Sequence, residues 1–233
     1  MIARQLLASL LIASSLVGCG RVPVAQDAPT PLPPQPDCSA AADPGALCIL
    51  VLGDSIAAGV PLSGDDRWWV HLAGTLGTAL PDRTVVIDSW AVPGSRVDVL
   101  ESAARDQSAI DSYDIAIVIE GVNDEIVQPV DTWQARYEAV IAAMEQRGLI
   151  VIVGTPPPGF QDGAFATRYD PTANALREVA HGRPLLDIAA RWHADGAAVA
   201  ATYYSDLIHQ SEAGQLLMAE MAHEVVLHAI EKP

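Results

Sequence analysis

Short apolar runs alternate with longer amphipathic segments along the chain beyond residue 45. The runs are rich in β-branched residues, which favours buried strands, whereas the longer segments have the spacing of helices with one apolar face. The pattern predicts five strands, at residues 47–52, 85–89, 115–119, 150–153 and 184–188. It also predicts helices at residues 68–80, 96–110, 132–147, 171–180 and 211–230.

Strands that alternate with helices in this way form a parallel sheet. Because both faces of a parallel sheet must be covered and its crossovers are right-handed, we expect an α/β fold, a three-layer α/β/α sandwich around a five-stranded parallel sheet. The pattern contains no internal repeat and no second domain. In such folds ligands bind beyond the carboxyl ends of the strands, so the segments there are the first candidates for chemistry.

Composition and charge narrow the class of protein. Half of the 233 residues are apolar and 18% are charged, which suits a folded domain and argues against a disordered chain. The net charge of −16, from 13 basic and 29 acidic residues, repels phosphate backbones. Nucleic acid is therefore not expected as a partner, and we interpret the acidity mainly as a source of solubility for a monomer.

The N-terminus has the features of an export signal. Arg4 precedes an apolar run over residues 6–17, which is shorter than the roughly 20 residues that span a bilayer but long enough for a signal-peptide core. Its end, Leu16-Val17-Gly18-Cys19, resembles the bacterial lipobox, in which the cysteine is diacylated and becomes the new N-terminus. We expect residues 1–18 to be a lipoprotein signal peptide and Cys19 to carry the lipid; an ordinary signal peptide beside an unrelated cysteine is the alternative.

This interpretation places the protein in the cell envelope, anchored by lipid alone to a bacterial membrane and facing away from the cytoplasm. Seven prolines between residues 20 and 45 favour an extended tether, so we assign residues 19–45 to the lipidated N-terminus and tether, and residues 46–233 to the folded domain. Cys38 and Cys48 are candidates for a disulfide in an exported protein, and neither has the surroundings of a catalytic thiol.

Polar or glycine-rich segments follow the first three predicted strands, at residues 53–55, 91–94 and 121–124. Ser55 lies on the turn that leaves the first strand, where Gly53 permits an unusual backbone angle and residues 56–58 can begin a helix. A helix N-terminus stabilises developing negative charge, which suits a nucleophile. Taken alone, however, Ser55 could equally be only a helix cap.

Asp206 and His209 are three residues apart, a separation at which one helical turn brings a carboxylate beside an imidazole. The carboxylate can then fix the tautomer of the ring, although for such a pair alone a surface ion pair before a helix is the favoured interpretation. The remaining histidines have no comparable partner at a strand end; they are His71, His181, His193, His223 and His228.

As a set, these segments resemble the conserved blocks of the SGNH (GDSL-type) hydrolase family, in order and in kind. The matching residues are Gly53-Asp54-Ser55-Ile56 for the GDSL block, with Ile for Leu, Gly94 for the second block, Gly121-Val122-Asn123-Asp124 for the GxND block, and Asp206-Leu207-Ile208-His209 for the DxxH block. The resemblance extends from Leu47 to about Ala229 and implies a flavodoxin-like SGNH hydrolase fold. One departure is Gln210, where family members often have a proline that stiffens the loop.

The resemblance implies a serine esterase in which Ser55 attacks an acyl carbonyl, His209 acts as base and then acid, and Asp206 orients His209. The Ser55 N–H, the Gly94 N–H and the Asn123 side-chain amide would form the oxyanion hole. An α/β-hydrolase is disfavoured because the position two after Ser55 is Ala57, not the glycine of that fold's nucleophile elbow. No cofactor is expected.

Two further acids follow predicted strands. We expect Asp54 and Asp124 to hold loops through hydrogen bonds to backbone N–H groups rather than to transfer protons. No cluster of His, Cys and acidic residues has the spacing of metal ligands, so no metal site is predicted.

The expected substrate is a small acyl ester, with acetylated carbohydrate, lysophospholipid, another short-chain ester and a thioester all left open. The loop at residues 155–167 is interpreted either as a wall of the pocket or as a surface loop stiffened by proline. Trp68, Trp69 and Trp90 could stack on a sugar or line an acyl site, although core packing is favoured. Two rival functions are a catalytically inactive, lipid-tethered binding protein and an acyltransferase that uses the same Ser55.

Overall fold

The computed structural model of the chain describes residues 38, 43, 45–105 and 110–231. The expected signal peptide, the lipidation site Cys19 and most of the expected tether lie outside the described residues. The predicted boundaries at residues 18 and 45 therefore stay predictions.

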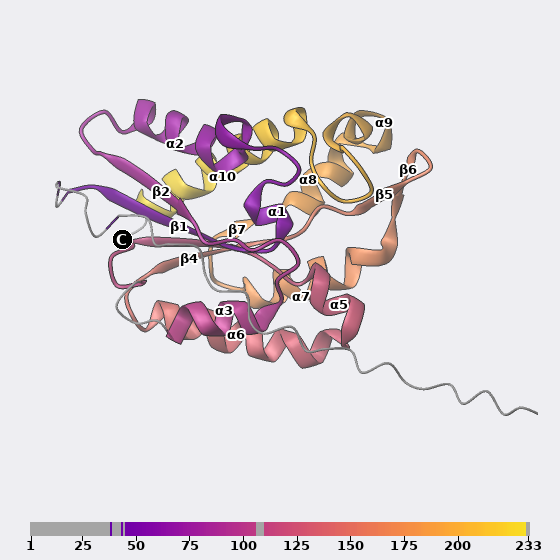
Figure 1. Cartoon of the computed structure of the whole chain (residues 1–233), viewed down its shortest axis with the longest axis horizontal. Coiled ribbons are helices and arrows are strands. Elements are labelled where there is room, and N and C mark those ends of the chain that lie inside the picture. The colour runs from indigo at the N-terminus through magenta and orange to yellow at the C-terminus, as the bar shows by residue number, and fades with distance from the viewer. Residues whose placement is uncertain (1–37, 39–42, 44, 106–109, 232–233) are drawn as a thin grey trace, which may run out of the picture. The chain divides into compact units, whose positions relative to one another are not determined.

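A five-stranded sheet forms the centre of the domain, and its paired strands all run parallel. In spatial order the strands are β2 (Val85–Ser89), β1 (Leu47–Gly53), β3 (Ile115–Ile119), β4 (Ile150–Gly154) and β7 (Leu185–Leu186) (Figure 1). The register aligns Gly53 with Ile119, and Ile119 with Gly154, in one row at the carboxyl edge. The predicted parallel α/β fold is confirmed.

Helices cover both faces of this sheet because every side chain of β1 and β3 is apolar and buried. Along β1, Ile49 and Val51 pack into one core, whereas Leu50 and Leu52 pack into the other. Figure 1 shows the two layers, one on each side of the sheet. The first contains α2 (Trp68–Ala79), α8 (Ile188–Asp195), α9 (Ala197–Ala200) and α10 (Glu212–Glu231); the second contains α3 (Val97–Arg105), α6 (Val130–Glu145) and α7 (Asp170–Val179).

Several short elements lie outside the predicted helices and strands because they have too few residues to show a period; among them, only a helix start at residues 56–58 was expected. They are α1 (Ser55–Ala58), α5 (Val122–Val127), the 3-10 turns Gly64–Asp66, Thr167–Tyr169 and Ala201–Tyr203, and the antiparallel hairpin of β5 (Gly159–Gln161) and β6 (Ala164–Ala166). Two of them, α1 and α5, directly follow strands at the carboxyl edge of the sheet.

The strand predicted at residues 184–188 is shorter in the structure. Only Leu185 and Leu186 pair with β4, and α8 begins at Ile188. Asp187 ends the strand because its Oδ1 accepts the Ala190 N–H at 3.0 Å, which caps the helix. Arg177 from α7 holds the same carboxylate at 2.8 Å, so a tertiary contact fixes the boundary.

Cys38 and Cys48 are joined by a disulfide that ties residue 38 to β1, and both are buried. Among the tryptophans considered for a substrate site, Trp68 and Trp90 lie in the core, whereas Trp69 is half-buried. No helix in the described part of the chain has the length and apolarity needed to cross a membrane.

Candidate active site

The turn after β1 brings Ser55 to the carboxyl edge of the sheet. Gly53 has φ +134°, and a Cβ there would lie 1.8 Å from the Ile119 carbonyl oxygen, so only glycine fits between β1 and β3. The next residue, Asp54, caps α1 by accepting the Ile56 N–H at Oδ1, at 2.8 Å. Ser55 is thereby held as the first residue of α1, with its side chain partly exposed.

Asp206 and His209 lie on a loop between the turn Ala201–Tyr203 and α10. The loop is closed by a bridge between Tyr204 and Gln210, and its residues form bends rather than the helical turn that we considered from their spacing. Asp206 builds this bend itself: its Oδ1 accepts the N–H groups of Ile208 at 2.9 Å and His209 at 2.8 Å.

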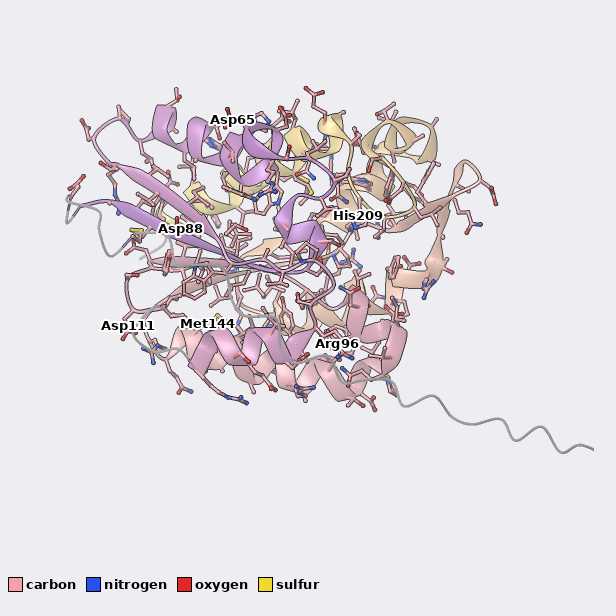
Figure 2. All side chains as sticks on the ribbon, viewed as in Figure 1. Asp65, Asp88, Arg96, Asp111, Met144 and His209 are labelled. Carbon is pink, nitrogen blue, oxygen red and sulfur yellow. A yellow bond between two sulfur atoms is a disulfide. The ribbon has the colours of Figure 1, made fainter. Side chains whose placement is uncertain are left out.

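A continuous line of hydrogen-bonding groups runs from this loop to α1. His209 Nδ1 lies 2.8 Å from Asp206 Oδ2, and His209 Nε2 lies 2.9 Å from Ser55 Oγ. Partial burial opposes ionisation of Asp206, yet hydrogen bonds from the His209 ring and from the backbone of His209 and Ile208 hold its pKa below the usual value. Figure 2 shows His209 toward the end of the sheet where the strands finish, opposite Asp111, which precedes β3.

The other two predicted site residues, Gly94 and Asn123, face the same space. Gly94 is exposed and has φ +82°, a left-handed conformation in the loop after β2. Asn123 is the second residue of α5, and its Nδ2 donates to the Ser95 carbonyl at 2.9 Å. Since a primary amide has two N–H groups, this bond uses one of them and leaves a second donor on the same atom.

Ser55, Gly94, Asn123 and His209 all line one open cavity of about 420 Å³. Its remaining wall consists of apolar and aromatic residues: Ile56, Val60, Pro93, Val122, Ile126, Tyr169 and Ile208. Ile56, Val122 and Ile208 lie within the quoted motif blocks, whereas Val60, Ile126 and Tyr169 gave no motif signal. An apolar wall around a few polar groups is typical of a small-molecule site.

The loop at residues 155–167 does not line this cavity, so its interpretation as a pocket wall is wrong. Its three prolines are buried, which also differs from a simple surface loop. The β5–β6 hairpin within it contacts the loop of His209 instead: the Phe160 N–H donates to the Leu207 carbonyl at 2.8 Å, and the Phe160 ring stacks on Tyr204.

Gln210, the departure from the family pattern, is fully buried, and its side-chain amide donates to the Ile208 carbonyl at 2.8 Å. The glutamine thus bonds the backbone two residues earlier in its own loop, at the place where a proline would restrict the backbone. Within residues 38, 43, 45–105 and 110–231, no three His, Cys, Asp or Glu side chains are grouped so that they could hold a metal ion.

Three buried acids lie behind the cavity. Asp124 accepts the Val97 N–H at 3.0 Å, and Asp54 accepts that of Ile56, so both hold backbone groups as predicted. Burial raises the pKa of Asp54 to about 7, although the Ile56 N–H and the charge of His209 oppose this effect. Burial also raises the pKa of Asp124, against the same kind of bond from Val97.

Glu120 is the third of these acids, and sequence reasoning missed it. Burial raises its pKa well above the usual value, and the charge of Asp54 adds to this effect. The sequence feature that could have identified Glu120 is its position, directly after the wholly apolar strand Ile115–Ile119 and directly before the GxND block. A charge in such a position is expected only where the fold supplies partners for it.

Comparison with known proteins gives a family match. A model of the GDSL-like Lipase/Acylhydrolase family matches residues 51–217, which include all four sequence blocks. No curated protein matches the chain at a significant level.

Solved structures with the same fold share little sequence with the chain. An acetyl xylan esterase, AlAXEase, is 20% identical, with a TM-score of 0.64 over 77% of this chain and 98% of its own. The acetylxylan esterase Axe2 from Geobacillus stearothermophilus is 16% identical, with a TM-score of 0.63 over 80% and 95% of the two chains. A member of the lipolytic G-D-S-L family from Veillonella parvula is 19% identical, with a TM-score of 0.64 over 78% and 99%.

At these identities the structures establish a common fold, and the family model, which covers most of the folded domain, establishes the relationship. The parallel sheet and the motif-bearing turns at its carboxyl edge agree with both. The chain therefore belongs to the GDSL-like lipase/acylhydrolase family of esterases and acylhydrolases.

Proposed function

We propose that this protein is a serine carboxylesterase that cleaves acyl esters through an acyl-enzyme, with Ser55 as nucleophile, His209 as general base and acid, and Asp206 as the orienting carboxylate. The observation that supports this most is the hydrogen-bond line Asp206–His209–Ser55 opening into a cavity that also presents Gly94 and Asn123. A nucleophile, a base oriented by a third group and a set of oxyanion donors are the parts that acyl transfer requires.

In the first step, Ser55 Oγ attacks the ester carbonyl carbon while its proton passes to His209 Nε2. The Asp206 carboxylate accepts a hydrogen bond from His209 Nδ1, so the neutral imidazole carries its hydrogen on Nδ1. The lone pair of His209 Nε2 therefore faces Ser55. The imidazolium that forms is stabilised by the ionised Asp206, whose lowered pKa keeps it charged at neutral pH. His209 then gives the proton to the leaving alcohol, and a water molecule repeats the sequence to release the acid.

The negative charge on the tetrahedral intermediate would be bound by the Ser55 N–H, the Gly94 N–H and the second N–H of Asn123 Nδ2. Ser55 begins α1, so its N–H has no acceptor within the helix and points out of its first turn. The left-handed backbone of Gly94 and the anchored amide of Asn123 set the other two donors before the substrate arrives, which is the requirement for electrostatic stabilisation.

The substrate that we propose is a small acyl ester. The apolar wall of the cavity suits an acyl group, and the open mouth leaves room for a larger alcohol part. Two of the structurally similar proteins are named as acetylxylan esterases, so acetylated carbohydrate is the first natural class to try.

The test measures hydrolysis of p-nitrophenyl acetate, butyrate and octanoate and of acetylated xylo-oligosaccharides by the purified protein. We expect Ser55→Ala and His209→Ala to lower kcat by about 10⁴-fold or more, and Asp206→Asn by up to about 10⁴-fold, in variants that remain folded. Ser102→Ala, the same change on the exposed face of α3, should leave kcat unchanged.

Persistence of full activity in folded Ser55→Ala would exclude this mechanism. An inert wild type that still binds esters would favour a binding protein, and acyl transfer from the ester to an added sugar in preference to water would identify an acyltransferase.

A further inference from the structure

Glu120 lies behind the proposed oxyanion hole and has almost no access to water. Only 1% of its surface is exposed, and it sits between the end of β3 and the start of α5. No Arg, Lys or His in the described part of the chain forms an ion pair with it. An ionised carboxylate without a cation at such a depth is costly, whereas the neutral acid needs only hydrogen-bond partners.

Those partners define where the hydrogen atoms lie. Glu120 Oε2 is 2.6 Å from Ser95 Oγ, and Ser95 Oγ is 3.0 Å from the Gly53 carbonyl oxygen. The hydroxyl of Ser95 has one hydrogen, and the carbonyl can only accept. Because that hydrogen can make a full two-centre bond to only one oxygen, both contacts are two-centre hydrogen bonds only if Glu120 donates to Ser95 and Ser95 donates to Gly53. The other oxygen of Glu120, Oε1, accepts the Gly121 N–H at 3.2 Å.

The groups around Glu120 strengthen this assignment. Asp54 faces it from the turn before α1 and Asp124 from α5, and both add negative charge. Tyr137 of α6 also lies near and donates its hydroxyl to the Val118 carbonyl at 3.1 Å. Two basic groups act on the neighbours of Glu120: the charge of His209 lowers the pKa of Asp54, and that of Arg96 lowers the pKa of Asp124. The bonds to Ser95 and to the Gly121 N–H oppose the rise in the pKa of Glu120, which burial dominates.

Ser95 connects Glu120 to three segments of the site. Its backbone carbonyl accepts from Asn123 Nδ2 at 2.9 Å, and it directly follows Gly94. Its hydroxyl reaches Gly53, two residues before Ser55. One buried residue, through its side chain and its backbone, thus joins the nucleophile turn, the Gly94 loop and the Asn123 helix, which otherwise come from distant parts of the sequence.

We propose that Glu120 is a positioning residue that remains protonated and, by donating to Ser95, holds the oxyanion donors at a fixed distance from Ser55. Its catalytic consequence rests on the proposed function, whereas its protonation does not. The two parts are therefore tested separately.

Protonation is tested by infrared spectroscopy and by unfolding. The carbonyl stretch of a neutral carboxylic acid should be present in the wild type at pH 7 and lost in Glu120→Gln, whose amide can donate the same bond to Ser95. Burial raises the pKa of Glu120, so the native state retains a proton that the unfolded chain releases above about pH 4.3.

The contribution of the protonated Glu120 to folding stability is complete below about pH 4.3. It is lost as pH rises through the pKa of Glu120 in the native state. The unfolding equilibrium constant of the wild type should therefore rise relative to Glu120→Gln by up to about tenfold per pH unit above about pH 4.3. The assignment of a protonated Glu120 would be overturned if the unfolding constants of the wild type and Glu120→Gln changed with pH in the same way and the infrared band of the neutral acid were equal in both.

Positioning is tested by kinetics on p-nitrophenyl acetate. Glu120→Ala should lower kcat by about tenfold to a hundredfold with little change in KM, because displacement of the donors affects the transition state more than ground-state binding. Glu120→Gln should restore most of that kcat. Tyr137→Phe removes another buried hydrogen bond nearby, and we expect it to lower stability while kcat is kept.

If Glu120→Ala does not fold, Ser95→Ala provides the same test, because it removes the oxygen through which Glu120 acts. Wild-type kcat in a folded Ser95→Ala or Glu120→Ala protein would overturn the positioning role. A wild type inactive on every ester would refute the proposed function instead, and the infrared and unfolding results would still decide the protonation of Glu120.

Discussion

Single side chains in this site serve a structural and a chemical partner at once. Asp206 uses Oδ1 to hold the backbone of its own loop and Oδ2 to accept from His209. Asn123 uses one N–H to bond Ser95, which leaves the other for the proposed oxyanion. Side chains restrained in this way lose little further freedom when the substrate binds, which is the physical basis of preorganisation.

At this scale we predict that Asn123→Ala lowers kcat for p-nitrophenyl acetate by about 10²–10³-fold, because one oxyanion donor is removed while substrate contacts in the ground state change little. Steady-state kinetics measures the effect. The matched control is Asn174→Ala on the exposed face of α7, which should behave as wild type. Equal kcat values for the two variants would remove Asn123 from the oxyanion hole.

Among the elements, the β5–β6 hairpin has the clearest relation to the site although it does not line the cavity. It supports the Asp206–His209 loop from behind, through the backbone bond to Leu207 and through the stacked rings of Phe160 and Tyr204, whose centroids are 5.0 Å apart. The Tyr204 hydroxyl also bonds the Pro158 carbonyl. The proline-rich segment therefore positions His209 indirectly.

We accordingly predict that Tyr204→Ala lowers kcat by about tenfold, because His209 loses part of its support, whereas Tyr204→Phe keeps the stacked ring and most of the activity. The aromatic contact is worth about 0.5–1.5 kcal/mol, so thermal unfolding should separate the two variants as well. A folded Tyr204→Ala protein with wild-type kcat would show that the loop holds its shape without the hairpin.

For the molecule as a whole, the family match begins at residue 51, and the disulfide between Cys38 and Cys48 ties the chain before it to β1. We propose that the residues before this point export the protein and attach it to a membrane through lipid on Cys19. The acidic domain, with a net charge of −16, would then be held near the surface by the anchor and not by attraction to anionic lipids.

The corresponding prediction concerns fatty-acid labelling in a bacterial host. The wild type should incorporate labelled fatty acid, Cys19→Ser should not, and Cys38→Ser should incorporate it as the wild type does although it lacks the disulfide. Mass spectrometry of the mature N-terminus would give the modified residue directly. An unmodified N-terminus at another position would identify an ordinary cleaved signal peptide.

The sequence by itself determined the parallel α/β architecture, because strand and helix periods are local properties of β1, α2 and α10. It also singled out Ser55, Gly94, Asn123, Asp206 and His209, through motifs whose order matches the family that the chain belongs to. Residue type and spacing are sufficient for such inferences, since neither depends on how distant segments pack.

Only the tertiary structure decided which side chains from those distant segments contact one another. Ser55 and His209 are 154 residues apart, and their 2.9 Å contact exists because β1 and the loop before α10 end at the same edge. The same packing brings Glu120 into contact with Ser95, and the contact of Arg177 with Asp187 ends β7 early. It also places the proline-rich loop against the loop of His209 instead of the cavity. These features depend on contacts between residues that are distant in sequence, and no local pattern encodes which distant groups will meet.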